Sequence, residues 1–144
     1  MNDARLELES ALALVREALE AKQPLNRYHA RAVLLPLGAR LAGADADAAR
    51  SEARTLLALV QPVRSVWQRA VEDELEMAIT EFVQSVDRRY LSRPDYDYRY
   101  TREARARVAD RLRAASELGI ALPTAGERAL ARADRDFAPF LERE

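Results

Sequence analysis

The feature that most constrains the fold is an apolar pattern with the period of an α-helix between about residues 63 and 90. At 100° per residue, its apolar side chains share one broad side, which excludes the carboxylates of Asp73 and Glu76. The apolar positions are Trp67, Val71, Leu75, Ala78, Ile79, Phe82, Val83, Val86 and Tyr90. A stretch with one apolar and one charged side packs against a hydrophobic core. The pattern therefore predicts a long amphipathic helix over about 63–90, with Trp67, Leu75, Phe82 and Val86 largely buried.

Shorter helical patterns, separated by capping residues and prolines, fill the rest of the chain. Asn26 and Thr101 are candidate N-caps, and Gly119 is a candidate C-terminal stop. Pro36 is expected to kink or split its helix, and Pro139 to fray the last one. No convincing pattern of period two predicts a strand. We expect helices over about 3–22, 26–43, 45–60, 63–90, 101–118 and 124–137. The prediction is an all-α fold, a single-domain bundle (1–144) of five or six helices.

Composition narrows the class of protein. Hydrophobic residues make up 49% of the 144 residues and charged residues 33%, which excludes a disordered chain. The net charge of −1 argues against bulk electrostatic coating of nucleic acid. The longest apolar run, residues 32–39, is far shorter than the roughly 20 residues of a membrane helix. The acidic N-terminus does not resemble a secretory signal. We therefore expect a cytoplasmic protein with no membrane association.

The usual catalytic constellations are absent from the sequence. There is no cysteine, and His29 is the only histidine, so neither a thiolate nucleophile nor a multi-histidine metal site can form. The four glycines form no phosphate-binding loop. The sequence therefore predicts neither enzymatic activity nor a cofactor.

An acidic cluster over residues 72–76 carries the one weak sign of metal chemistry. Glu72 and Glu76 lie one helical turn apart, so their carboxylates could hold one hard cation such as Mg²⁺. A similar cluster occurs in all-α nucleoside triphosphate pyrophosphohydrolases, where a second pair spaced like Glu-x-x-Asp follows on the next helix. Here the third residue after Glu103 is Ala106, so that second pair is missing. The simpler interpretation is a solvated helix face.

The charge changes sign abruptly after residue 87. Residues 70–87 contain six acidic residues and no basic ones, whereas residues 88–113 contain nine arginines and four acidic residues, a net charge of +5. Four of the five tyrosines lie in this second stretch, which we call the Tyr/Arg segment. Its candidate binding residues are Arg88, Arg89, Tyr96, Tyr98, Tyr100, Arg102, Arg105 and Arg113. Arginines interleaved with tyrosines are typical of binding surfaces.

Three functional hypotheses follow. The first is a non-catalytic interaction protein, which either self-associates, with a dimer expected, or docks on a protein partner. It would use the Tyr/Arg segment and the acidic face of helix 72–87. The alternative is a nucleic-acid-binding module that uses the same basic and aromatic residues. The third is a carboxylate-metal hydrolase at Glu72 and Glu76. A purely structural explanation also stands, in which the tyrosines cover one end of the bundle and the two charge blocks pair within the chain.

Overall fold

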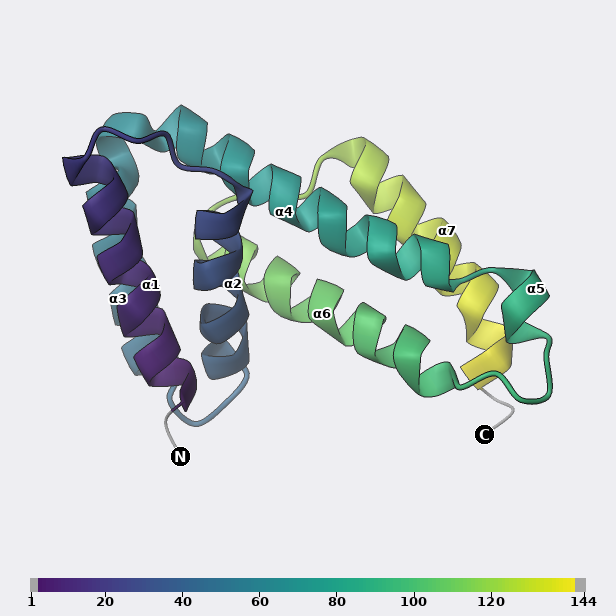
Figure 1. Ribbon diagram of the computed structural model, residues 1–144. Coiled ribbons are helices and arrows are strands. Elements are labelled where there is room, and N and C mark those ends of the chain that lie inside the picture. The colour runs from purple at the N-terminus through teal and green to yellow at the C-terminus, as the bar shows by residue number, and fades with distance from the viewer. Residues whose placement is uncertain (1–2, 142–144) are drawn as a thin grey trace.

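The computed structural model describes residues 3–141, apart from the side chains of Asp3 and Arg88, and this part of the chain contains helices and no strands (Figure 1). Six of the helices are longer than one turn. They are α1 (Asp3–Glu20), α2 (Arg27–Leu41), α3 (Ala46–Val60), α4 (Arg64–Ser85), α6 (Tyr98–Glu117) and α7 (Thr124–Leu141). A 3₁₀ turn, η1 (Gln61–Val63), precedes α4, and a single helical turn, α5 (Arg88–Leu91), precedes α6. The predicted all-α bundle is confirmed.

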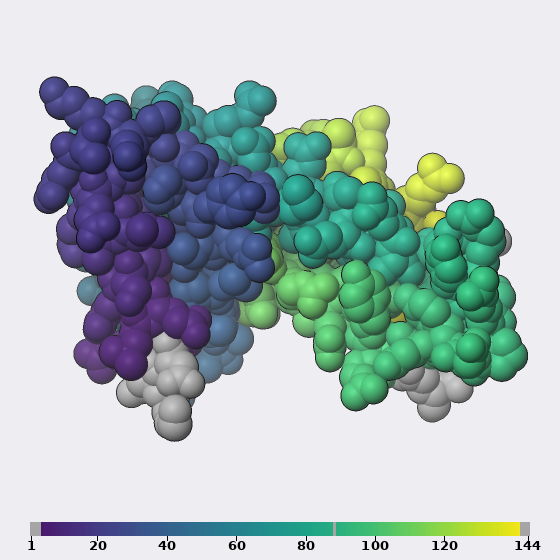
Figure 2. Space-filling view, in the orientation of Figure 1, coloured from purple at the N-terminus to yellow at the C-terminus, as the bar shows by residue number. Residues whose placement is uncertain are grey.

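Helix α4 connects the two ends of the molecule (Figure 1). Helices α1, α2 and α3 lie at one end, while α6 and α7 pack along α4 toward the other. Helix α2 contacts α1 and also packs on α4 and α6, so it joins the two parts. The space-filling view shows the atoms of the N-terminal helices gathered at one end (Figure 2).

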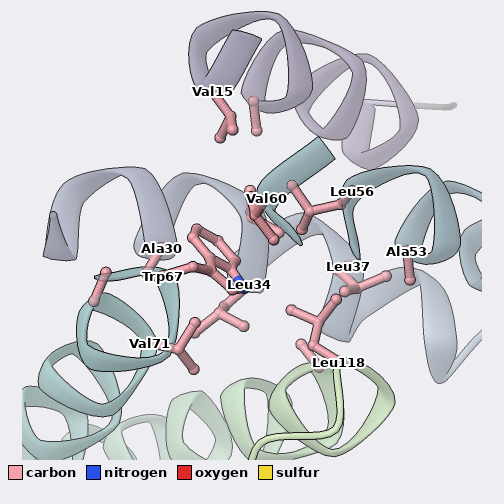
Figure 3. Close-up of a cluster of buried hydrophobic side chains, with 14 of the residues drawn as sticks. Val15, Ala30, Leu34, Leu37, Ala53, Leu56, Val60, Trp67, Val71 and Leu118 are labelled. Atoms are coloured by element: carbon pink, nitrogen blue, oxygen red, sulfur yellow. The ribbon is translucent and has the colours of Figure 1, made fainter. Parts of the chain in front are cut away.

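The hydrophobic core consists of two clusters that α4 links. The larger cluster surrounds Trp67, which is 2% exposed, and includes Val60 and Leu34 (Figure 3). The smaller cluster surrounds Phe82, which has no exposed surface and meets Phe137 of α7 edge to face at 6.3 Å. Helix α4 supplies a large side chain to each cluster, so its apolar side contributes to both parts of the core. The predicted burial of Trp67, Leu75 and Phe82 is confirmed, and Val86 is half-buried.

The predicted helix over 63–90 is wrong at its C-terminal end. Helix α4 ends at Ser85, whose hydroxyl donates a hydrogen bond to the carbonyl oxygen of Phe82 at 2.6 Å. The side chain of Asp87 then accepts a hydrogen bond from the backbone N–H of Arg89 and starts the short helix α5. These local side-chain bonds compete with the helical ladder. The interruption leaves Tyr90 45% exposed, although the periodic pattern includes it on the apolar side.

The predicted N-cap of the next helix is also wrong. Helix α6 begins at Tyr98, and its N-cap is Asp97, whose carboxylate accepts a hydrogen bond from the N–H of Arg99. Thr101 is fully buried, and its hydroxyl lies 2.9 Å from the hydroxyl of Tyr96. Both residues are good caps. Tertiary packing uses the threonine hydroxyl, so the aspartate starts the helix.

The prolines interrupt the helices less than expected. Helix α2 runs through Pro36 without being split, and α7 continues through Pro139 to Leu141. Pro36 is itself buried, and Phe140 is 7% exposed, so packing holds both segments in place. Tertiary contacts here override the local cost of a proline.

Two other predicted helix signals are confirmed. Asn26 caps α2 through the N–H of Tyr28, while Nδ1 of His29 accepts from the N–H of Asn26, which completes a capping box. The single histidine therefore has a structural partner. Gly119 follows α6 with φ of 74°, and the N–H of Ile120 donates to the carbonyl of Ala115 at 2.9 Å. This geometry is a Schellman motif, which requires a left-handed residue at the glycine position.

The backbones of helices α2 and α6 lie close together at Gly38. A methyl group added there would lie 2.8 Å from the carbonyl carbon of Asp110 and closer still to its oxygen. We expect Gly38→Ala to lower the free energy of unfolding by about 1–3 kcal/mol, because the backbones must separate. Gly43→Ala is the matched control, since its new methyl group would lie 3.7 Å from the nearest carbonyl oxygen. Urea denaturation of both variants checks this, and equal stabilities would contradict the close approach.

Candidate functional site

Two of the four tyrosines of the Tyr/Arg segment, Tyr96 and Tyr98, pack against their own chain. The hydroxyl of Tyr98 donates to the carbonyl of Leu91 at 2.7 Å, and the rings of Tyr96 and Tyr98 meet edge to face at 5.6 Å. Both side chains are half-buried. Because α6 begins at Tyr98, Tyr100 lies in its first turn and remains 56% exposed. These contacts agree with the structural interpretation of the segment, in which its tyrosines cover the end of the bundle.

The predicted arginines of the segment bind different parts of the molecule. Arg105 makes two hydrogen bonds to Asp134 of α7, at 2.8 and 3.2 Å. Arg113 donates to the carbonyl of Gly38 in α2 at 3.0 Å and to Asp110 at 2.8 Å. Arg102 also takes part in an interaction. The side chain of Arg88 lies outside the described part of the chain. The structure therefore directs Arg105 and Arg113 toward different helices.

Arg89 pairs with its neighbour Asp87. Its Nη2 lies 2.9 Å from the Asp87 carboxylate, and the hydrogen bonds from Arg89 hold the pKa of that carboxyl below its usual value. The pair is exposed to solvent, so its contribution to stability is small. This pair joins two residues that are close in sequence and does not connect α5 to another helix.

The two charge blocks pair within the chain at several points. Glu74 pairs with Arg111 at 2.7 Å, Asp87 pairs with Arg89, and Glu81 lies 3.9 Å from Arg107. The interpretation that the acidic and basic stretches neutralise each other within the chain is confirmed for these pairs. A partner molecule is not needed to explain them.

The interpretation of the acidic cluster 72–76 as a solvated helix face is wrong at Glu74. The side chain of Glu74 is 2% exposed, and its two oxygens accept hydrogen bonds from Arg27 of α2 at 3.1 Å and from Arg111 of α6 at 2.7 Å. Arg111 is itself almost completely buried. The resulting charged triad, Arg27–Glu74–Arg111, joins three helices. The helical period already carried this signal, because position 74 lies between the buried positions 70, 71, 75 and 78 on the apolar side.

Glu72 and Glu76 line a cavity of about 460 Å³ between α4 and the start of α7. Asp73 lies on the same wall but pairs with Arg69 at 3.4 Å, and Gly126 and Ala129 line the wall opposite. Within residues 3–141, no group of three or more histidine, aspartate or glutamate side chains is arranged to hold a metal ion. The hydrolase hypothesis gains no ligand set from this geometry.

Four arginines line a second, smaller cavity that sequence reasoning did not identify. It has a volume of about 280 Å³ and lies where α2 meets α4 and α6. Arg27 and Arg31 of α2 line it, as do Arg107 and Arg111 of α6, and each pair is spaced by one helical turn. Helix α4 supplies Glu74, Met77, Ala78 and Glu81 to the third wall. We call this the arginine cavity.

A third hollow is an apolar groove of about 500 Å³ between α1 and α2. Leu6 and Leu14 of α1 line it and remain 62% and 44% exposed. The other lining residues are Glu7, Ser10, Ala11, Ala32, Leu35 and Pro36. Scattered exposed leucines are ordinary, but apolar side chains gathered along one groove mark a surface suited to another helix. We call this the α1–α2 groove.

Comparisons with protein-family models, with curated proteins and with solved structures found no match to the chain. Over the part of the chain that the structure describes, no helix combines the length and the apolar character needed to cross a membrane. Inferences about function therefore depend on the geometry of the chain itself.

Proposed function

We propose that this chain is a non-catalytic helical interaction protein that forms a dimer through the α1–α2 groove. The observation that supports this proposal is the partial exposure of Leu6 and Leu14 in a groove lined mainly by apolar side chains. Water contact with such side chains is unfavourable by about 25 cal/mol per Å² of apolar surface, and a second helix removes it. The class of function is the one expected from the sequence, but the surface is different.

The spacing along α1 favours a second copy of the chain as the occupant. Leu6 and Leu14 lie four residues on either side of Ser10, about 6 Å along the helix axis in each direction. When two copies of α1 cross in antiparallel directions at Ser10, Leu6 of each copy meets Leu14 of the other. The small serine side chain permits close approach at the crossing point. A two-fold symmetric interface requires this kind of self-complementarity.

The Tyr/Arg segment supports an interface less strongly. Tyr96 and Tyr98 donate or share their hydroxyl hydrogen bonds within the chain, and Arg105 is already held by Asp134. Recruiting these side chains for a partner would require existing contacts to break. For the nucleic-acid alternative the same argument holds, because phosphate contacts need guanidinium groups that can turn toward the ligand.

The double variant Leu6→Gln/Leu14→Gln tests the proposal. Glutamine preserves helix propensity and adds no charge, so we expect the fold to be retained while dimerisation is lost. A buried leucine contributes about 1.5–3 kcal/mol, and the dimer buries four of these side chains in part. The dissociation constant should therefore rise by roughly two orders of magnitude or more. Sedimentation velocity over a wide concentration range measures the change.

Val66→Gln/Val83→Gln is the matched control. Both valines lie on α4, outside the groove, and are 42% and 38% exposed. The control should sediment as the unmodified protein does. A monomeric unmodified protein, or equal dissociation constants for the two variants, would overturn the proposed interface.

A further inference from the structure

The arginine cavity carries an excess of positive charge that the chain does not neutralise. Four arginines line it, and the only acidic residues in the lining are Glu74 and Glu81, so the lining residues have a net charge of +2. A concave site lined by one sign of charge focuses its electric field and attracts ions of opposite sign. This cavity is separate from the α1–α2 groove in its lining residues, so the inference does not depend on the proposed dimer.

The inner pair of arginines is held in position by Glu74. One carboxylate oxygen accepts from Nη1 of Arg27, and the other accepts from Nε of Arg111. Arg111 makes a further hydrogen bond to the carbonyl of Arg107, one turn earlier on α6. With Arg111 buried and both groups bonded, this side of the cavity is rigid before any ligand binds. Such preorganisation reduces the entropy lost on binding.

The outer pair lacks strong partners. Arg31 is exposed and makes no hydrogen bond or ion pair with the part of the chain that the structure describes. Nε of Arg107 lies 3.9 Å from the nearest Glu81 oxygen, which is too long for a hydrogen bond, and the Glu81 side chain is 48% exposed. The guanidinium groups of Arg31 and Arg107 therefore retain donors that a ligand in the cavity can use.

We propose that the arginine cavity binds a small oxyanion with two negative charges, which Arg31 and Arg107 hold by charge-assisted hydrogen bonds. Guanidinium groups present paired N–H donors that match the oxygens of a phosphate or a carboxylate. The two negative charges of such a ligand would balance the net charge of +2 on the lining residues. At about 280 Å³, the cavity lies just below the usual range for ligand pockets, about 300–1,000 Å³, so a phosphate group or a short dicarboxylate fits its size.

Thermal unfolding with added anions tests this proposal. A ligand that binds only the folded protein raises the melting temperature in a saturable way. The probes are inorganic phosphate and succinate, each compared with chloride at equal ionic strength. Saturation by phosphate alone identifies a phosphate-bearing ligand, and saturation by succinate alone identifies a dicarboxylate. Saturation by both shows that the cavity selects its ligand by negative charge. All three outcomes support an oxyanion site, whereas equal effects of phosphate, succinate and chloride would overturn it.

Variants locate the site in the cavity. In Arg31→Gln/Arg107→Gln the apparent dissociation constant should rise by at least about tenfold, because two charged donors are removed. Arg54→Gln/Arg64→Gln is the matched control, since both arginines are exposed and lie outside the cavity lining. If the first variant folds poorly, the single change Arg31→Gln keeps the test valid, since Arg31 has no partner in the described structure to lose. Equal affinity in the cavity variant and the control would overturn the proposal.

Discussion

Phe82→Ala is expected to lower the free energy of unfolding by about 3–5 kcal/mol. Phe82 has no exposed surface, and its ring meets Phe137 at 6.3 Å while the guanidinium of Arg105 lies 5.9 Å from its centre. Truncation to alanine therefore removes the centre of the smaller hydrophobic cluster and leaves a cavity that α4 and α7 can close only in part. Chemical denaturation monitored by circular dichroism measures the loss.

The neighbouring residue provides the control for this experiment. Val83 is 38% exposed on the same turn of α4, so Val83→Ala should change stability by no more than about 0.5 kcal/mol. Alanine also has the higher helix propensity. A loss below about 1 kcal/mol for Phe82→Ala would show that the apolar side of α4 does not support the second cluster.

Much of the fold could be predicted because the strongest signals are local. The period of α4 places Trp67, Leu75 and Phe82 in the core. The capping signal of Asn26 and the left-handed position of Gly119 depend on residues within one turn of a helix end. Interactions of this kind need no knowledge of the remaining chain. These local signals are sufficient to predict the order of the helices along the chain and the all-α fold class.

Helix boundaries were less predictable where two local interactions competed. Asp97 and Thr101 are both suitable N-caps, and the choice depends on Tyr96, whose hydroxyl engages Thr101. Similarly, the apolar period passes through residue 86, but Ser85 and Asp87 end one helix and begin another. Tertiary contacts and side-chain hydrogen bonds decided these positions, and neither is visible in an apolar pattern.

The candidate sites were harder to predict because they join residues from distant parts of the chain. The sequence stretch 88–113 contains Arg107 and Arg111, but Arg27 and Arg31 come from α2 and meet them only through the packing of α2 on α4 and α6. The α1–α2 groove likewise depends on how two helices pack. Glu74 is the exception, since its place on the apolar side of α4 was a usable signal for a buried, paired charge.

The buried charged triad gives the second large expected effect. Glu74→Met removes the carboxylate but leaves the guanidinium of Arg111 buried, so we expect it to lower the free energy of unfolding by about 3–5 kcal/mol. Arg111→Met should lower the free energy of unfolding by a similar amount. It leaves the buried carboxylate of Glu74 with only the partly exposed Arg27 as a partner. Substitution of Arg27 should lower the free energy of unfolding less, because its side chain is 24% exposed and the charge of Glu74 still has Arg111 as a partner. Urea denaturation of each single variant gives these values.

The double variant Glu74→Met/Arg111→Met separates the cost of burying charge from the value of the pair. Desolvation of two charges opposes their attraction, so replacing both with apolar side chains of similar length is often neutral or stabilising. We therefore expect the double variant to be more stable than either single variant. If the loss of unfolding free energy in the double variant equalled the sum of the losses in the two single variants, the two side chains would be energetically independent despite their 2.7 Å contact. A double variant as stable as the unmodified protein would mean that the triad contributes little net stability. Its charges would then matter chiefly through the fixed arginine positions that they impose on the cavity between α2, α4 and α6.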